Sequence, residues 1–109
     1  MLCCSCASAL AAENSQDVSQ LFFEANQAYK AADYQRAAAA YQSIIQSGVM
    51  SGHLFYNLGN ACLKAGEIGR AILSYRKAEM LMPRSEDLET NLRYALEQTT
   101  DKIECRELP

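Results

Sequence analysis

Cysteine and histidine have the widest chemical range in this sequence, whose 109 residues contain five of the first and one of the second. Cys3, Cys4 and Cys6 stand close together, and clustered thiolates bind zinc or iron–sulfur units when further ligands complete the site. No second group of Cys or His completes a four-ligand set, since His53 is the only histidine. We therefore expect no metal centre.

Two other thiol chemistries are open to these cysteines. A lipid-anchored cysteine needs a run of small residues before it, and the residues before Cys6 match that pattern poorly. Cys62 lies in the body of the chain and Cys105 near its end. The sequence leaves open whether these two form a disulfide after export or remain one packed and one tail thiol.

Catalytic groups are sparse as well. A nucleophile needs a base, and His53 is expected at the start of a helix beside a glycine, as a surface residue. Glu67 and the acidic run 86–89 stand at helix starts, where carboxylates favour the helix dipole. The segment 66–69 contains two glycines but reads as a helix connection, not as a phosphate-binding loop. We expect no enzymatic activity, no cofactor and no small-molecule substrate.

The charge balance excludes a further class of partner. Ten basic and 13 acidic residues give a net charge of -3, whereas non-specific nucleic-acid binding needs a basic face. We expect no nucleic-acid partner. The 50% apolar and 21% charged content is typical of a single globular domain, and no apolar run approaches the ~18 residues that a membrane-spanning helix needs.

Residues 1–12 differ from the rest of the chain because they carry no charge. The apolar stretch ending in Ala9-Leu10-Ala11 resembles the core and cleavage site of a secretory signal, although no basic residue precedes it. We expect an exported protein, periplasmic or membrane-associated, in which cleavage removes the three clustered thiols. The alternative is a cytoplasmic protein with an apolar N-terminus.

From residue 18 onward, apolar residues recur with helical spacing. We expect helices over 19–31, 34–47, 53–65, 68–81 and 86–98. No segment alternates with period two, so we expect an all-α fold with no sheet. Asp33 and Ser85 are expected N-caps, Gly66 is expected to end a helix in a left-handed turn, and Pro83 is expected to stop the fourth helix.

The helices repeat with a period of 34 residues, which aligns 18–51 with 52–85. Seven aligned pairs are identical, namely Asn26/Asn60, Lys30/Lys64, Ala31/Ala65, Arg36/Arg70, Ala37/Ala71, Tyr41/Tyr75 and Ser51/Ser85. Each unit is expected to be a helix hairpin whose apolar face needs a neighbour. Ala25 and Gly59 are small where the two helices of a hairpin cross, so Gly59→Leu is expected to push them apart.

The last expected helix, 86–98, has the pattern of a cap. Its apolar stripe consists of Leu88, Leu92, Ala95 and Leu96. Acidic and basic residues occupy the other faces. We expect it to close the open end of the array and to present a polar surface to water.

The second unit resembles the tetratricopeptide repeat. The residues that carry this resemblance are Phe55, Leu58, Gly59, Gly66, Ala71, Tyr75, Ala78 and Pro83. Cys62 replaces a usual aromatic residue, and the first unit departs further, with Glu24-Ala25 in place of Leu-Gly. The resemblance implies a right-handed α-solenoid whose parts are a signal-like segment at 1–12, a repeat domain at 18–98 (repeats 18–51 and 52–85, cap 86–98) and a tail at 99–109.

A narrower resemblance covers the region from Leu54 onward. The pair Asn91-Leu92 and the run from Thr99 to Glu104, TTDKIE, are similar to those of the BatE-type proteins of bacterial aerotolerance operons. The resemblance implies a periplasm-facing repeat domain that works beside membrane proteins with von Willebrand factor A domains and a MoxR-type ATPase. Members usually continue into a membrane segment and a small β-domain, whereas this sequence ends at Pro109, which leaves membrane anchoring open.

In the resembled fold, the first helix of each repeat lines a concave groove. On this register the groove residues are Phe22, Asn26, Tyr29, Lys30, His53, Tyr56, Asn57, Asn60, Leu63 and Lys64. Asparagine amides bond both the donors and the acceptors of an extended peptide, aromatic rings supply contact area, and the lysines favour an acidic segment. The alternative for Phe22, Tyr29 and Leu63 is packing between helices.

Two functions follow from this groove. The first is a non-enzymatic scaffold that binds a protein or peptide segment within an envelope complex. The alternative is a secretion or folding chaperone that shields an apolar client segment, which the polar Asn and Lys residues disfavour. Self-association through the open N-terminal end is a third, weaker hypothesis. A clamp for a C-terminal carboxylate is not expected, because Phe22, Asp87 and Asn91 stand where it needs cations.

Overall fold

The computed structural model describes residues 18–107, with side chains as far as residue 100, and every regular element in this part of the chain is a helix. The expectation of an all-α fold is therefore confirmed for the described residues. The signal-like segment 1–12 and its three cysteines lie outside them, and so does the Cys105 side chain.

The helices begin and end close to where the apolar periodicity predicts them. The bounds are 18–30 for the first helix, Tyr34–Gln46 for α2, Gly52–Lys64 for α3, Ile68–Leu81 for α4 and Glu86–Glu107 for α5. Helix α5 corrects the sequence prediction, because it continues to Glu107 and the tail expected from residue 99 is largely helical. The physical reason is that 99–107 contains neither Gly nor Pro to stop a helix.

The two hairpins turn through the same backbone geometry. Gly66 has a φ of 84°, as expected, and Ala32, which stands 34 residues earlier, has a φ of 63°. In both turns the next amide donates back across the helix end, from Asp33 to the Ala28 carbonyl and from Glu67 to the Cys62 carbonyl, at 2.9 Å each. A left-handed residue with this bond is a Schellman ending, which glycine adopts without strain and alanine does not.

Among α2 to α5, a side chain caps the helix N-terminus only where serine stands. The Ser85 hydroxyl accepts from the Leu88 amide at 3.3 Å, as expected, and Ser51 accepts from the Leu54 amide at 3.4 Å. Asp33 occupies the N-cap position of α2, but its side chain makes no capping hydrogen bond. The prediction for Asp33 was therefore right in position and wrong in mechanism, because its φ and ψ of -89° and 73° differ from the extended backbone seen at Ser51.

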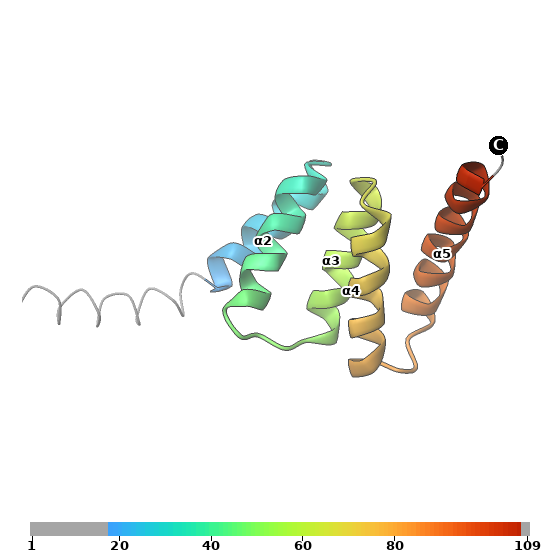
Figure 1. Cartoon of the computed structure of the whole chain (residues 1–109). Coiled ribbons are helices and arrows are strands. Elements are labelled where there is room, and N and C mark those ends of the chain that lie inside the picture. Colours follow the sequence, from blue (N-terminus) through green and yellow to red (C-terminus); the bar gives the residue numbers. More distant parts are fainter. Residues whose placement is uncertain (1–17, 108–109) are drawn as a thin grey trace, which may run out of the picture.

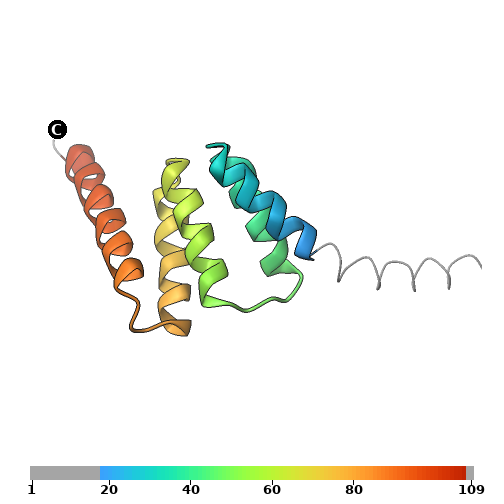
Figure 2. The same cartoon turned by 180° about the vertical axis from the view of Figure 1, so that it is seen from behind.

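The helices form two layers. In Figure 1, α2 and α4 lie toward the viewer, and in Figure 2, seen from behind, the 18–30 helix and α3 lie in front of them. Helix α3 packs against both α2 and α4, and α5 packs mainly against α4 and touches α3. The first helices of the two hairpins therefore share one face, which is the face on which groove residues are expected.

The core runs between these layers. Tyr75, Ile44, Leu54, Leu88 and Cys62 are its largest fully buried side chains. A Cβ placed on Gly59 would stand 2.5 Å from Cδ1 of Tyr75, so the glycine permits the close crossing of α3 and α4 that the sequence predicts. Leu88, Leu92 and Ala95 of α5 are buried, whereas Leu96 is 36% exposed and leaves the expected stripe.

Candidate functional site

Asparagine–tyrosine pairs recur along the face shared by the 18–30 helix and α3. The Tyr41 hydroxyl donates to Oδ1 of Asn26 at 2.6 Å, and the Tyr75 hydroxyl donates to Oδ1 of Asn60 at 2.6 Å. Both pairs are partly buried and join the first helix of a hairpin to the second. Because such a pair satisfies a buried phenol, each carbonyl oxygen has a structural role, and the repeat extends from sequence identity to hydrogen bonding.

Helix α5 adds a third asparagine to this arrangement. Nδ2 of Asn91 donates at 3.0 Å both to the Tyr56 hydroxyl and to Oδ1 of Asn60. Asn91 stands 34 residues after Asn57, and Tyr94 stands 34 residues after Asn60. The repeat register therefore continues into α5, which contributes to the concave face as well as closing the array.

Two of the pockets lie side by side on this face and share Tyr29 and Asn60. The first has a volume of about 230 Å³ and is lined by Asn26, Tyr29, Lys30, Tyr41, Asn57 and Asn60. The second has a volume of about 450 Å³ and is lined by Tyr29, Asn60, Leu63, Lys64, Asn91 and Tyr94.

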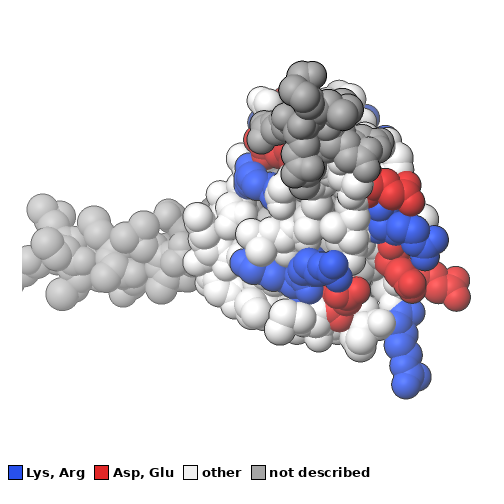
Figure 3. All heavy atoms as spheres, turned by 45° about the vertical axis from the view of Figure 1, so that its right-hand side comes forward, with Lys and Arg blue, Asp and Glu red and all other residues white. Residues whose placement is uncertain are grey.

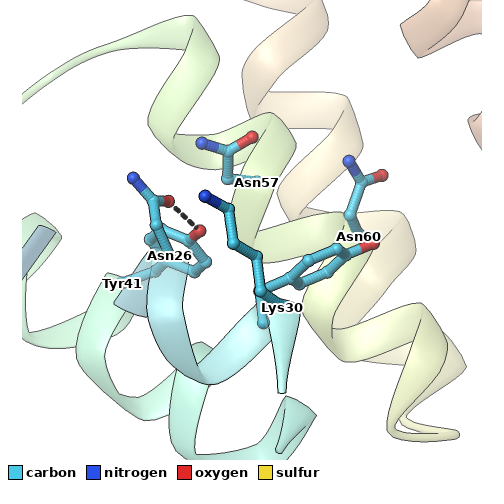
Figure 4. A pocket seen from close by; sticks show the side chains of 6 residues that line it. Asn26, Lys30, Tyr41, Asn57 and Asn60 are labelled. Carbon is cyan, nitrogen blue, oxygen red and sulfur yellow. Dashed lines mark hydrogen bonds between the residues drawn. The ribbon is translucent and has the colours of Figure 1, made fainter. Parts of the chain in front are cut away.

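Hydrogen-bond donors dominate the first pocket. Figure 4 shows the Lys30 side chain extending toward the amides of Asn26 and Asn57. Oδ1 of Asn26 accepts from one tyrosine hydroxyl, and Oδ1 of Asn60 accepts from a tyrosine hydroxyl and from Asn91. The amide nitrogens of both residues make no hydrogen bond to a described residue, so each can donate to a ligand. Among the described side chains, none is hydrogen-bonded to the Asn57 amide. The pocket thus suits a group that accepts hydrogen bonds.

The second pocket is of mixed character. Leu63 and the half-exposed Tyr94 supply apolar surface, and Lys64 and Asn91 supply polar groups. Together the two pockets form a surface, here called the concave groove, that offers hydrogen-bond donors along its length and apolar contact from Leu63 and Tyr94 in the second pocket.

Seven of the ten expected groove residues line these two pockets, namely Asn26, Tyr29, Lys30, Asn57, Asn60, Leu63 and Lys64. The other three do not. The Phe22 ring packs edge-on against Tyr41 with centroids 6.0 Å apart, and Tyr56 packs on Tyr75 at the same separation. His53 is exposed near the start of α3. Interhelical packing, the alternative stated for Phe22, is therefore what the structure supports.

Sequence reasoning missed Tyr41, Asn91 and Tyr94 as lining residues. Tyr41 belongs to a second helix of a hairpin, where only core residues are expected. Asn91 and Tyr94 belong to the capping helix, yet the 34-residue offset from Asn57 and Asn60 is present in the sequence. Extending the repeat comparison beyond residue 85 finds both.

Burial controls the ionisation of the tyrosines behind the groove. It raises the pKa of Tyr75 far above the usual value and raises the pKa values of Tyr41 and Tyr29 in the same direction. The Tyr75 and Tyr41 hydroxyls therefore stay protonated and keep donating to the asparagines. Burial likewise raises the pKa of the free Cys62 thiol, which disfavours the reactive thiolate.

Metal-ligand clusters and membrane-spanning helices are both absent from the described part of the chain. No three His, Cys, Asp or Glu side chains gather there into a group that could hold a metal ion. The helices within residues 18–107 also lack the combination of length and apolar content needed to cross a membrane.

The fold and the groove define an all-α protein built of antiparallel helix hairpins, with a polar concave face. No protein-family model matches the chain, and no curated protein matches it either. The groove itself is therefore the feature from which function is inferred.

Proposed function

We propose that this chain is a non-enzymatic interaction module of the tetratricopeptide type, whose concave groove binds an extended segment of a protein partner. The observation that carries the proposal is the donor-lined pocket between the 18–30 helix and α3, flanked by Lys30. The 34-residue repeat of the Asn–Tyr hydrogen bonds supports the repeat type, because it recurs in hairpins of equal design.

The lining chemistry favours one kind of segment. The amides of Asn26, Asn57 and Asn60 suit the carbonyls of an extended backbone, and Lys30 and Lys64 suit carboxylates beside it. Tyr94 and Leu63 favour an apolar side chain at the far end. We infer an acidic segment that carries one bulky apolar residue.

The resemblance to the BatE-type proteins extends the proposal to a cellular setting. We propose that the module is exported and acts as a scaffold in a bacterial envelope complex, beside membrane proteins with von Willebrand factor A domains. A chaperone that shields an apolar client remains the alternative function, and it would favour a less polar pocket than the one lined by three asparagines.

Capture from cells tests this function directly. The tagged full chain is crosslinked in the membrane fraction, purified and analysed by mass spectrometry, alongside Lys30→Glu/Lys64→Glu and Asn57→Asp. Asn57→Asp replaces a donor by a charged acceptor of the same size, so both variants should lose partner recovery about tenfold or more, which is the effect of ~1.4 kcal/mol. Circular dichroism verifies that each variant keeps its helical content.

A matched control separates the groove from total charge. Arg76→Glu/Arg84→Glu makes the same change in net charge at two exposed residues outside the groove and should leave capture unchanged. Recovery of proteins with von Willebrand factor A domains by wild type supports the envelope scaffold. Equal recovery by folded groove variants would remove the groove from the proposal, and recovery of cytosolic secretion clients would favour the chaperone.

A further inference from the structure

The N-terminal face of the first hairpin differs from the corresponding face of the second. A pocket of about 360 Å³ on this face is lined by Phe23, Glu24, Gln27, Ala28, Ala31, Asp33 and Arg36. We call this set of residues the N-terminal face. Phe23 is 60% exposed within it, although it belongs to a helix whose other aromatic residues are partly buried.

The equivalent residues of the second hairpin are covered by a neighbouring helix. Thirty-four residues later, the positions of Glu24, Gln27 and Ala28 are taken by Leu58, Ala61 and Cys62. These three are at most 4% exposed in the folded chain, where α3 lies beside α2. The part of the N-terminal face formed by Glu24, Gln27 and Ala28 is therefore the surface that an adjoining hairpin would cover, and no described residue covers it. Asp33 and Arg36 lie at its edge, because their counterparts Glu67 and Arg70 stay partly exposed in the second hairpin.

The residue types on the N-terminal face, compared with those at the equivalent positions of the second hairpin, favour a partner that binds reversibly. Glu24 and Gln27 replace the apolar Leu58 and Ala61, which makes the face tolerable in water, while Phe23, Ala28 and Ala31 keep it partly apolar. Small alanines beside one large exposed ring give a surface on which a second ring can seat.

The N-terminal face carries charges of both signs, so the faces of two copies can be complementary to each other. In the second hairpin Arg70 pairs with Glu67 at 2.6 Å, whereas among the described residues no ion pair joins the equivalent Arg36 and Asp33. Asp33 is one methylene shorter than Glu67. Arg36 thus lies on one face with two carboxylates, Glu24 and Asp33, so a copy related by a twofold axis can set its acids against this arginine.

The opposite end of the molecule is not suited to be the partner of this face. Helix α5 carries Glu86, Asp87 and Glu89 in its first turn and an exposed Arg93–Glu89 ion pair at 3.7 Å. Figure 3, which brings this end forward, shows acidic and basic side chains interspersed over it. Stacking one copy's N-terminal face on another's α5 would bury these charges, so pairing of like faces is favoured.

We propose that two copies of this chain associate through their N-terminal faces, with Phe23 of each copy seated on the alanines of the other and Arg36 of each facing Glu24 and Asp33 of the other. The partner is a second copy of the chain, and the closed pairing yields a dimer. The two concave grooves lie outside this interface and remain accessible.

Analytical ultracentrifugation of the full chain tests the pairing. The concentration is raised to about 1 mM, so that even a dimer with a millimolar Kd is detected. Wild type should dimerise with concentration. Phe23→Glu should weaken the dimer at least about tenfold without loss of helical content. Met80→Glu, which places the same charge on an 83% exposed residue of α4, is the matched control and should leave the dimer unchanged.

A charge exchange tests the orientation of the pair. Arg36→Glu alone and Glu24→Arg/Asp33→Arg alone should each be monomeric, and a mixture of the two should associate. A full chain that stays monomeric throughout overturns the proposal, whether residues 1–17 or solvent then covers the face. A dimer that Phe23→Glu leaves intact, or a mixture that fails to associate, overturns it as well.

Discussion

At the scale of single residues, the two hairpin turns form an internal comparison. Ala32 and Gly66 occupy the same left-handed position, and nothing lies within 4 Å of a Cβ built on Gly66. The strain at Ala32 is therefore a backbone effect alone, and it costs about 1–2 kcal/mol in an L-residue, partly offset by the freedom that glycine gains when unfolded.

Ala32→Gly should therefore raise the free energy of unfolding by up to about 1 kcal/mol, and Gly66→Ala should lower it by a similar amount. Urea denaturation followed by circular dichroism measures both. A change of the same sign in the two variants would contradict the equivalence of the turns.

Tyr75 couples stability to alkaline pH. Its folded pKa is raised by burial above its unfolded value, so its contribution is fully present below about pH 10 and declines as the pH rises toward the folded pKa. Tyr75→Phe should cost about 1 kcal/mol at neutral pH, because the bond to Asn60 is lost. Tyr75→Phe should also make the free energy of unfolding depend less steeply on pH above about 10. Urea titrations at several pH values measure this dependence. An unchanged slope of the free energy against pH would show that Tyr75 does not ionise on unfolding.

At the scale of elements, one glycine sets the distance between α3 and α4. The Tyr75 ring that a Cβ at Gly59 would meet is fully buried and has no room to move. Gly59→Ala should therefore destabilise the protein by about 1–3 kcal/mol through overpacking. Gly69→Ala in α4, where nothing lies within 4 Å, is the control and should be neutral or stabilising. Equal effects in thermal denaturation would contradict the close crossing.

Helix α5 shows how one element serves two purposes. Its buried side carries Leu88, Leu92 and Ala95 against the second hairpin, and its concave side carries Asn91 and Tyr94. The hydrogen bonds from Asn91 to Tyr56 and Asn60 fix the groove to the cap. The element that closes the array is therefore also the one that shapes the second pocket.

At the scale of the whole molecule, the two ends have different surfaces. The C-terminal end is closed by a charged helix, whereas the N-terminal face keeps an exposed phenylalanine between charges of both signs. Two helix hairpins and one further helix bury little surface, and repeat arrays of fewer than three units are marginal. Pairing of two copies would enlarge the core without using either groove, which is why the dimer and the groove can be tested separately.

The sequence by itself determined the helices, their period and most of the concave residues. Helical spacing of apolar side chains and the punctuation at Gly66 and Ser85 are local properties, so they can be read without the fold. The 34-residue offset placed Asn26 and Asn60 at equivalent positions, and the resemblance to the tetratricopeptide repeat implied ten groove residues, seven of which line the two pockets.

Only the tertiary structure decided what each side chain does there. Whether Phe22 faces a ligand or packs on Tyr41, and whether the oxygen of Asn60 is free or bonded to Tyr75, depends on helices that are distant in sequence. The share of α5 in the groove was likewise missed, because a cap and a further groove helix have the same amphipathic pattern, although the 34-residue offset to Asn91 and Tyr94 is present in the sequence. Packing between elements, which no local periodicity encodes, makes that distinction.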